Sequence, residues 1–356
     1  MWGFGVLFLT IYLVANGYLF WRVMGLVATT PLMVRIVVGI LFWLCALMLF
    51  VSMALRHSDL PQHISRTMFS LGSGWLIFLL YATLLTALFD IVRLTHPALP
   101  ALLITAIVMV AGYVNYRNPK VVHYNLPSPK VEQQTRLVAI SDVHLGHGTD
   151  RADFERYIAL INAQKPDMVL IAGDLIDNSL HPVRKERIEE AITLIEAPRG
   201  IFMAVGNHEY ISGIDEAVEY LATTPIRVLR DSSVVVGDIA IVGRDDKMNR
   251  ERQPLAMLMP EGEHYTIVLD HQPTAIMESA EAGIDLHISG HTHRGQVWPL
   301  NLITDHIFEQ SHGYRKWCDT HAIVSMGLSL WGPKFRIGTS SELIVIDIEP
   351  TAESTN

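Results

Sequence analysis

The sequence predicts an α/β domain that follows four membrane-spanning helices. The first part of the chain holds four nearly uncharged apolar segments, whereas the remainder alternates short apolar strands with amphipathic helices. Several of these strands run directly into clusters of Asp, Asn and His residues, at the strand ends where layered α/β folds place their sites. We therefore divide the chain into a membrane region, residues 1–118, an α/β domain, residues 119–350, and a tail, residues 351–356.

The apolar residues are concentrated in the first third of the chain. Mean hydropathy is +0.29 and only 18% of the residues are charged, both unusual for a soluble protein. The apolar segments are Trp2 to Trp21, Ile36 to Leu55, Met68 to Phe89 and Ala98 to Val114. The first lacks the basic start and the cleavage site of a signal peptide, and burial of four such segments in a soluble protein is rare. Because about 20 apolar residues cross a bilayer as a helix, we predict four membrane helices.

The remainder of the chain is acidic. Six of the 27 Lys and Arg residues and two of the 36 Asp and Glu residues precede residue 119, which leaves a formal charge of −13 on the rest. Such a domain repels nucleic-acid phosphates, so we expect no nucleic-acid partner. It also needs bound cations at any site for an anionic substrate. Cys45 and Cys318 lie far apart and predict no disulfide framework.

Strands and helices alternate beyond a linker, Asn115 to Arg136, that contains three prolines. Val121 to Tyr124 within this linker is expected to be an edge strand. Short apolar runs predict the core strands Leu137–Ile140, Met168–Ala172, Ile201–Val205, Val234–Val242, Thr266–Leu269, Leu286–Ser289 and Leu343–Ile348. Apolar residues at helical spacing predict helices at Ala152–Ala163 and Glu186–Glu196.

Five of the predicted strands end at polar clusters. The clusters are Ser141-Asp-Val-His, Gly173-Asp, Gly206-Asn-His-Glu, Asp270-His-Gln-Pro and Gly290-His-Thr-His. Their carboxylate, amide and imidazole groups, without a thiolate, suit two adjacent divalent ions that activate water. A single Asp after a strand is usually a helix N-cap and a single His is usually structural, but an ordered series of eight such residues is not explained in that way.

In this order the clusters resemble those of the calcineurin-like metallophosphoesterase superfamily, over roughly residues 120–349. The motifs most similar to its bacterial membrane-associated branch are Ser141-Asp-Val-His-Leu-Gly, Gly173-Asp-Leu-Ile-Asp, Gly290-His-Thr-His-Arg-Gly-Gln and the closing Gly327-Leu-Ser with Arg336 and Glu342. The resemblance implies a four-layer α/β/β/α sandwich with two divalent ions, Mn, Fe, Zn or similar. Glu209 stands where Asp is more usual, a departure that is expected to keep function. Arg294 stands where this branch commonly has Gly, a departure that is expected to reshape the pocket.

The resemblance also implies a role for each matching residue. The first ion would be held by Asp142, His144 and His293. The second ion would be held by Asn207, His271 and His291. Asp174 would bridge both ions, because a carboxylate has two oxygens. Metal-bound hydroxide would then attack phosphorus, with His208 facing the leaving oxygen as proton donor or charge stabiliser.

Several neighbouring residues have less specific interpretations. Structural roles, or the positioning of a ligand, are expected for His147, His287 and Asp177. Glu209 is expected to pack or to accept hydrogen bonds. Core packing is favoured over a lipid-facing rim for Trp298, Trp317 and Trp331, although with Met326, Leu328 and Leu330 they would form an apolar lip. Arg294 and Arg336 are expected either to contact a substrate phosphate or to form surface ion pairs.

The sequence thus predicts a membrane-anchored, metal-dependent phosphohydrolase that cleaves a phosphoester or pyrophosphate bond in a phosphodiester or lipid-linked substrate. One alternative is a non-catalytic metal-binding scaffold of the same fold. The resemblance also implies an alternative among enzymes, a pyrophosphatase that releases UMP from a UDP-acylglucosamine, as related branches of the superfamily do. The expected partners are membrane lipids and a phosphate-containing small molecule or lipid, and the oligomeric state is open.

Four spans place both chain termini on one side of the membrane. The basic residues that flank this side are Arg56, Arg66, Arg117 and Lys120, against Arg22, Arg35 and Arg93 on the other. Because basic residues favour the cytoplasmic side, this excess of four to three predicts that the α/β domain lies in the cytoplasm. The resemblance to the bacterial membrane-associated branch implies that the membrane of this multi-pass protein is the bacterial inner membrane.

Overall fold

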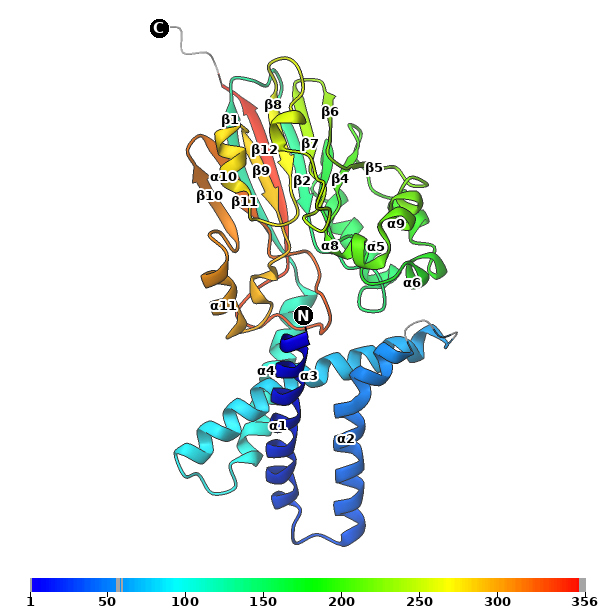
Figure 1. Cartoon of the computed structure of the whole chain (residues 1–356), viewed down its shortest axis with the longest axis vertical. Coiled ribbons are helices and arrows are strands. Elements are labelled where there is room, and N and C mark those ends of the chain that lie inside the picture. Colours follow the sequence, from blue (N-terminus) through cyan, green and yellow to red (C-terminus); the bar gives the residue numbers. More distant parts are fainter. Residues whose placement is uncertain (1, 56–57, 59, 352–356) are drawn as a thin grey trace. The chain divides into compact units, whose positions relative to one another are not determined.

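The computed structural model describes residues 2–55, 58 and 60–351 of the chain. These residues form two compact units. The helical unit contains the residues up to Val114 together with the segment Gly332–Ile337, and the α/β unit contains Asn115–Trp331 and the residues from Gly338 onward. Figure 1 shows the ribbon of both units, coloured along the sequence.

Four long helices make up most of the helical unit. They are α1 (Trp2–Leu26), α2 (Leu32–Ala54), α3 (Gln62–Ile91) and α4 (Ala98–Arg117). Each is long and apolar enough to cross a membrane, which confirms the four helices expected from the sequence. A small core that includes Leu19, Phe42 and Leu79 joins α1, α2 and α3. Most other Leu, Ile and Val side chains of these helices are exposed, as in a bundle that faces lipid.

The segment Gly332–Ile337 is the only part of the helical unit that comes from late in the described sequence. The backbone N–H of Arg336 donates to the carbonyl oxygen of Gly112 in α4 over 3.0 Å. The ring of Phe335 meets the ring of Tyr113 edge to face, at 6.4 Å between centroids. These contacts connect the segment to the last turns of α4.

Two six-stranded sheets form the centre of the α/β unit, in the orders β1-β12-β2-β3-β4-β5 and β10-β11-β9-β8-β7-β6. The first sheet contains β1 (Lys120–Ser128), β2 (Thr135–Ile140), β3 (Met168–Ala172), β4 (Ile201–Ala204), β5 (Ile226–Leu229) and β12 (Glu342–Pro350). The second contains β6 (Ser232–Val236), β7 (Ile239–Gly243), β8 (Tyr265–Leu269), β9 (Leu286–Ser289), β10 (Gly313–Trp317) and β11 (Thr320–Val324).

Side chains that alternate along the strands divide the hydrophobic core into layers. In β2, Leu137 and Ala139 belong to the cluster between the sheets, whereas Val138 and Ile140 belong to the cluster under the helices of the first sheet. Continuous apolar runs such as β3 are buried along their whole length, because both faces of the sheet are covered.

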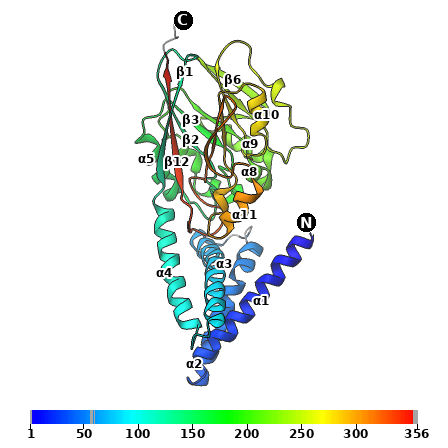
Figure 2. The ribbon, with the colours of Figure 1, turned by 90° about the vertical axis from the view of Figure 1, so that its left-hand side faces the viewer.

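Helices cover the outer face of each sheet. Those that follow strands of the first sheet are α5 (Arg151–Asn162), α6 (Leu180–Lys185), α7 (Ile188–Ile192), α8 (Asn207–Ser212) and α9 (Ile214–Leu221). The helix α10 (Ile276–Glu281) covers the second sheet beside β10 and β11, whereas α11 (Leu300–Ile307) follows β9 in the chain and packs against the turn His293–Gly295. Figure 2 shows α5 and α10 on opposite sides of the paired sheets. The expected four-layer α/β/β/α sandwich is therefore confirmed.

The helix α5 illustrates how the sequence specifies a local element. Asp150 is its N-cap, and its side chain accepts a hydrogen bond from the backbone N–H of Asp153 over 2.8 Å. Phe154, Ile158 and Ile161 recur at helical spacing and are buried against the first sheet.

The edge strand expected at Val121 to Tyr124 is confirmed, but it is longer than predicted: β1 pairs with β12 from Lys120 to Ser128, so that only Asn118 and Pro119 separate α4 from β1. Two other expectations for the α/β unit were wrong in detail. The single strand expected over 234–242 is the hairpin β6–β7, which turns at Gly237, where φ is 64°. The helix expected over 186–196 is reduced to α7, because Arg187 adopts a left-handed conformation and separates it from α6.

Candidate metal centre

The five polar clusters all lie at the ends of strands, as expected. In the first sheet they follow β2, β3 and β4, which run parallel to one another. In the second sheet they follow the parallel strands β8 and β9. Because the two sheets pack face to face, the ends of these strands bring the clusters together.

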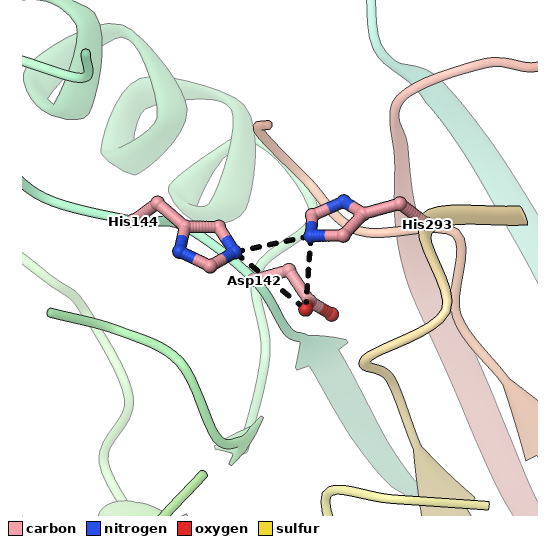
Figure 3. Close-up of side chains that lie close together, drawn as sticks. All are labelled: Asp142, His144 and His293. Atoms are coloured by element: carbon pink, nitrogen blue, oxygen red, sulfur yellow. Dashed lines mark hydrogen bonds and ion pairs between the residues drawn. The ribbon is translucent and has the colours of Figure 1, made fainter. Parts of the chain in front are cut away.

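The first group of donor atoms contains Asp142, His144 and His293. Figure 3 shows the three side chains directed toward one another. Nε2 of His144 lies 3.0 Å from Nε2 of His293, and Oδ1 of Asp142 lies 3.3 Å from His293 Nε2 and 3.7 Å from His144 Nε2. Ligand atoms that surround a metal tetrahedrally at about 2.1 Å are about 3.4 Å apart, so this spacing fits one small divalent ion.

The second group contains Asp174, His271 and His291, each with a donor atom within 4.8 Å of the others. Nε2 of His271 lies 3.0 Å from Oδ2 of Asp174 and 3.2 Å from Oδ1 of Asn207. Nδ1 of His271 lies 2.7 Å from the carbonyl oxygen of Ala172, which fixes the ring and directs Nε2 into the group. The carboxylate, amide and imidazole donors again suit a divalent ion.

Asp174 connects the two groups. Its Oδ2 atom lies 3.0 Å from Nε2 of His271 in the second group and 3.9 Å from Nε2 of His144 in the first. Its other oxygen, Oδ1, accepts a hydrogen bond from the backbone N–H of His208 over 2.8 Å. The clustered donors therefore match a dinuclear metal site.

His208 lies beside the first group, next to Asp177. Its Nδ1 atom is 3.0 Å from Oδ1 of Asp177, which is also 3.5 Å from Nδ1 of His144. The rings of His144 and His208 meet edge to face at 4.5 Å between centroids. Asp177 thus contacts both His208 and the candidate ligand His144. The sequence suggested a structural or positioning role for it, as the second Asp of Gly173-Asp-Leu-Ile-Asp.

Backbone strain is concentrated in these loops. Positive φ angles, which L-residues rarely adopt, occur at five of the seven candidate ligands: Asp142, His144, Asp174, His291 and His293. Such conformations cost about 1–3 kcal/mol each and persist where the surrounding structure enforces them. A Cβ atom at Gly206 would overlap Asp174, and one at Gly290 would overlap Asp142. Both glycines therefore allow the close approach of the loops.

Glu209 stabilises the loop of Asp174 by accepting backbone hydrogen bonds. Its buried carboxylate accepts hydrogen bonds from the backbone N–H groups of Asp174, Ile176 and Gly206, over 3.0, 2.9 and 2.7 Å. Burial, reinforced by the charge of Asp174, raises the pKa of Glu209 to about 7. The structure thus shows the hydrogen-bonding role expected for Glu209.

The electrostatics of the site favour bound positive charge. Although burial opposes its ionisation, the imidazoles of His293 and His144 hold the pKa of Asp142 well below its usual range. Burial likewise disfavours protonation of His144, but Asp142 and Asp177 raise its pKa to about 10. Burial and the charge of His271 lower the pKa of His291 to about 4. Buried carboxylates that draw protons onto imidazoles also draw divalent ions, and the two compete.

The remaining candidate residues lie outside these two groups. Nη2 of Arg294 is 3.7 Å from Oδ2 of Asp305, whereas Arg336 is 1% exposed and belongs to the helical unit. Trp317 is buried as core, and Trp298 and Trp331 are about half exposed. The expected apolar lip was wrong for Leu328 and Leu330, which are buried.

His287, for which a structural role was expected, lies buried between two hydroxyl groups. Its Nδ1 is 2.8 Å from Oγ of Ser279, and its Nε2 is 2.8 Å from Oγ of Ser289. Neither hydroxyl belongs to the two donor groups, so the His287 ring has a structural role: it connects buried polar side chains beside the second sheet.

Comparison with known proteins identifies similar sequences. The model of the calcineurin-like phosphoesterase family matches residues 135–295. A metallophosphoesterase of Helicobacter pylori is 31% identical over 247 residues, which cover 67% of this chain and 66% of the relative. One of Campylobacter jejuni is 29% identical over 259 residues, which cover 70% of this chain and 69% of the relative.

A further relative is described as a transmembrane protein. A transmembrane protein with metallophosphoesterase domain from Danio rerio is 32% identical over 266 residues, which cover 68% of this chain and 60% of the relative. The chain thus spans about two thirds of the length of these three relatives.

Proposed function

Because the chain belongs to the calcineurin-like metallophosphoesterase superfamily, we propose that it is a membrane-anchored phosphohydrolase that uses two divalent ions to cleave a phosphoester or pyrophosphate bond. The observation that carries this proposal is the position of Asp174. A single carboxylate oxygen reaches a histidine of each donor group, at 3.0 and 3.9 Å. Two ions that share a ligand lie close enough to act on one phosphoryl group.

The proposed ligands follow from the two groups. Asp142, His144 and His293 hold one ion, and Asn207, His271 and His291 hold the other, with Asp174 between them. Asn207 contributes an amide oxygen, which binds a cation without adding negative charge beside an anionic substrate. When bound, the two ions lower the pKa of a water molecule and stabilise the charge on the phosphoryl oxygens.

His208 is the proposed proton donor to the leaving oxygen. Its Nδ1 atom lies against Asp177, which orients the ring and leaves Nε2 as the nitrogen that faces the substrate. Its backbone N–H holds Oδ1 of Asp174, so the same residue positions the carboxylate shared by both groups.

The proposed substrate is a phosphodiester or a lipid-linked phosphate or pyrophosphate. Four membrane-length helices in the same chain, and relatives described as transmembrane proteins, support a role at a membrane. The proposed location is the bacterial inner membrane with the α/β unit on the cytoplasmic side. The excess of basic residues beside that side, four against three, supports this orientation.

The test uses the full chain purified in detergent. Metal content is measured beside the hydrolysis of a chromogenic phosphodiester, before and after excess EDTA and after readdition of Mn²⁺. We expect activity to disappear with the bound metal and to return with it. Equal activity after the metal content has fallen to zero would contradict the proposal. A metal-loaded protein that turns over no phosphodiester, monoester or pyrophosphate would instead be the non-catalytic scaffold.

A further inference from the structure

The helix α11 (Leu300–Ile307) exposes most of its apolar residues, together with Asp305 and His306. The buried residue of this helix is Asn301, which is 8% exposed. Leu302, Ile303 and Ile307 are instead 57%, 54% and 67% exposed. A helix at a water-facing surface normally buries its apolar residues and exposes its polar ones. The outer face of α11 is therefore suited to an apolar environment.

The exposed apolar surface extends beyond the helix. Trp298 and Leu300, which lead into α11, are also exposed. Each such side chain leaves apolar area in contact with water, which is unfavourable. Scattered apolar residues at a surface are ordinary, but a continuous group of them marks an interaction site. We refer to Trp298, Leu300, Leu302, Ile303 and Ile307 as the α11 patch.

The short connection between α4 and β1 would keep this patch near a membrane. The helix α4, long enough to cross a bilayer, ends at Arg117, and the strand β1 begins at Lys120. The two residues between them span at most about 7 Å of extended chain. An α/β unit on so short a connection stays at the membrane surface, where lipid is present at high effective concentration. Trp side chains are also enriched at this interface.

Three contacts connect the end of α11 to the loop that carries the proposed ligands His291 and His293. The ring of Phe308 meets the ring of His291 edge to face at 6.1 Å between centroids. Arg294 pairs with Asp305 of α11 at 3.7 Å. The hydroxyl of Thr292 donates to the carbonyl oxygen of Ser311 over 2.5 Å. A helix seated in lipid would hold this loop, and with it the second donor group, at the same surface.

We propose that the α11 patch inserts into the lipid surface of the membrane and presents the His291–Arg294 loop to the phosphate of an amphiphilic substrate. The occupant of the patch is the boundary between headgroups and acyl chains, the depth at which amphipathic helices bury their apolar face. The substrate part of this inference rests on the proposed function, whereas insertion of the patch does not depend on catalysis.

Insertion is tested with a nitroxide label on the full chain in lipid nanodiscs. After replacement of Cys45 and Cys318 by Ala, single cysteines are introduced by Ile303→Cys and, as a control of matched exposure on another surface, by Leu194→Cys; the native side chains are 54% and 53% exposed. We expect the label at position 303 to collide more with oxygen, which concentrates in lipid, and the label at position 194 more with a water-soluble nickel chelate. Equal nickel accessibility at both positions would overturn the proposal. Protection of position 303 from both reagents would do so as well, because it would indicate cover by protein, such as a second copy.

The functional consequence is tested with Leu302→Gln/Ile303→Gln and a matched control, Leu194→Gln. The variant should raise the KM for a phosphodiester lipid in mixed micelles by about tenfold, equivalent to roughly 1.4 kcal/mol, and leave hydrolysis of a soluble chromogenic phosphodiester unchanged. The control should change neither. Equal losses on both substrates would overturn the substrate part of the inference. A wild-type protein that binds metal but cleaves neither substrate would contradict the proposed function and leave the labelling result valid.

Discussion

Oδ1 of Asp177 lies 3.0 Å from Nδ1 of His208. Both side chains are buried, and the same carboxylate is 3.5 Å from Nδ1 of His144. Although burial opposes its ionisation, the adjacent imidazoles of His144 and His208 hold the pKa of Asp177 below its usual value. The carboxylate therefore remains charged and orients both rings, one of a proposed metal ligand and one of the proposed proton donor.

Replacement of Asp174 and replacement of His208 should have different effects. Asp174→Ala removes the carboxylate that both donor groups share, so we expect loss of bound metal together with activity. His208→Ala should retain the metal and lower kcat by about 10²–10⁴-fold, the usual contribution of a positioned acid or base. Metal analysis of the purified variants beside their kinetics separates the two roles. A His208→Ala protein without metal would refute our assignment.

Loss of the contact between Asp177 and His208 should reduce the rate more than it reduces binding. Asp177→Asn preserves the size of the side chain but removes its charge. Because partners that orient a functional His are worth about 10–100-fold, we expect kcat to fall by that factor while KM changes little. The measurement is steady-state kinetics at fixed metal content. If KM rose and kcat stayed constant, Asp177 would act in substrate binding and not in positioning.

Glu209 should affect stability more than chemistry. Glu209→Ala would leave three buried backbone N–H groups without their acceptor. Each unsatisfied group costs about 1–3 kcal/mol, so we expect the free energy of unfolding to fall by at least about 3 kcal/mol. Denaturant unfolding in detergent measures this change. Glu209→Asp, which keeps a carboxylate, is the control and should lose less; an Ala variant as stable as wild type would exclude the supporting role.

His287 should make the stability depend on pH. Burial lowers the pKa of His287 to about 4, whereas an unfolded imidazole titrates near about 6.5. The unfolded chain therefore takes up the proton first. The stability due to neutral His287 is complete above pH 6.5 and is lost as the pH falls toward 4, by up to about 3 kcal/mol.

The check is the thermal unfolding midpoint of the full chain between pH 7.5 and 5. We expect the midpoint of wild type to fall more steeply with acid than that of His287→Gln, which does not titrate. The metal site titrates equally in both proteins, so the difference between the two slopes isolates His287. Parallel slopes would show that this ring does not control the response to acid.

The elements that were predicted best from the sequence are those whose local residue pattern is sufficient to identify them. The strand Met168–Ala172 was predicted to the residue because a strand buried on both faces is continuously apolar. The hairpin β6–β7 was read as one strand because apolar residues continue on both sides of Gly237. The strand β10 escaped prediction because Tyr314 to Lys316 are exposed and polar.

The contacts between residues of the candidate site could not be predicted, because they join segments that are distant in the sequence. The pairing of Asp177 with His208 joins loops that are 31 residues apart, and no local pattern encodes it. The same holds for the exposure of the apolar residues of α11, because an apolar pair such as Leu302-Ile303 has the same sequence whether it faces a core or the outside. Periodicity identifies a helix, but only packing shows which of its faces is covered.

The chain crosses between its two units three times, after Val114, after Trp331 and after Ile337. A chain cut before β1 would thus lose α4 but retain Phe335 and Ile337, whose partners Tyr113 and Gly112 would be gone. The helical unit and the α/β unit are consequently not interchangeable modules. An exchange of helices between two relatives by a single crossover would combine the four helices of one parent with the Gly332–Ile337 segment of the other. Recombination that preserves folding has to transfer both pieces together, so the four helices and this late segment should be inherited as one unit.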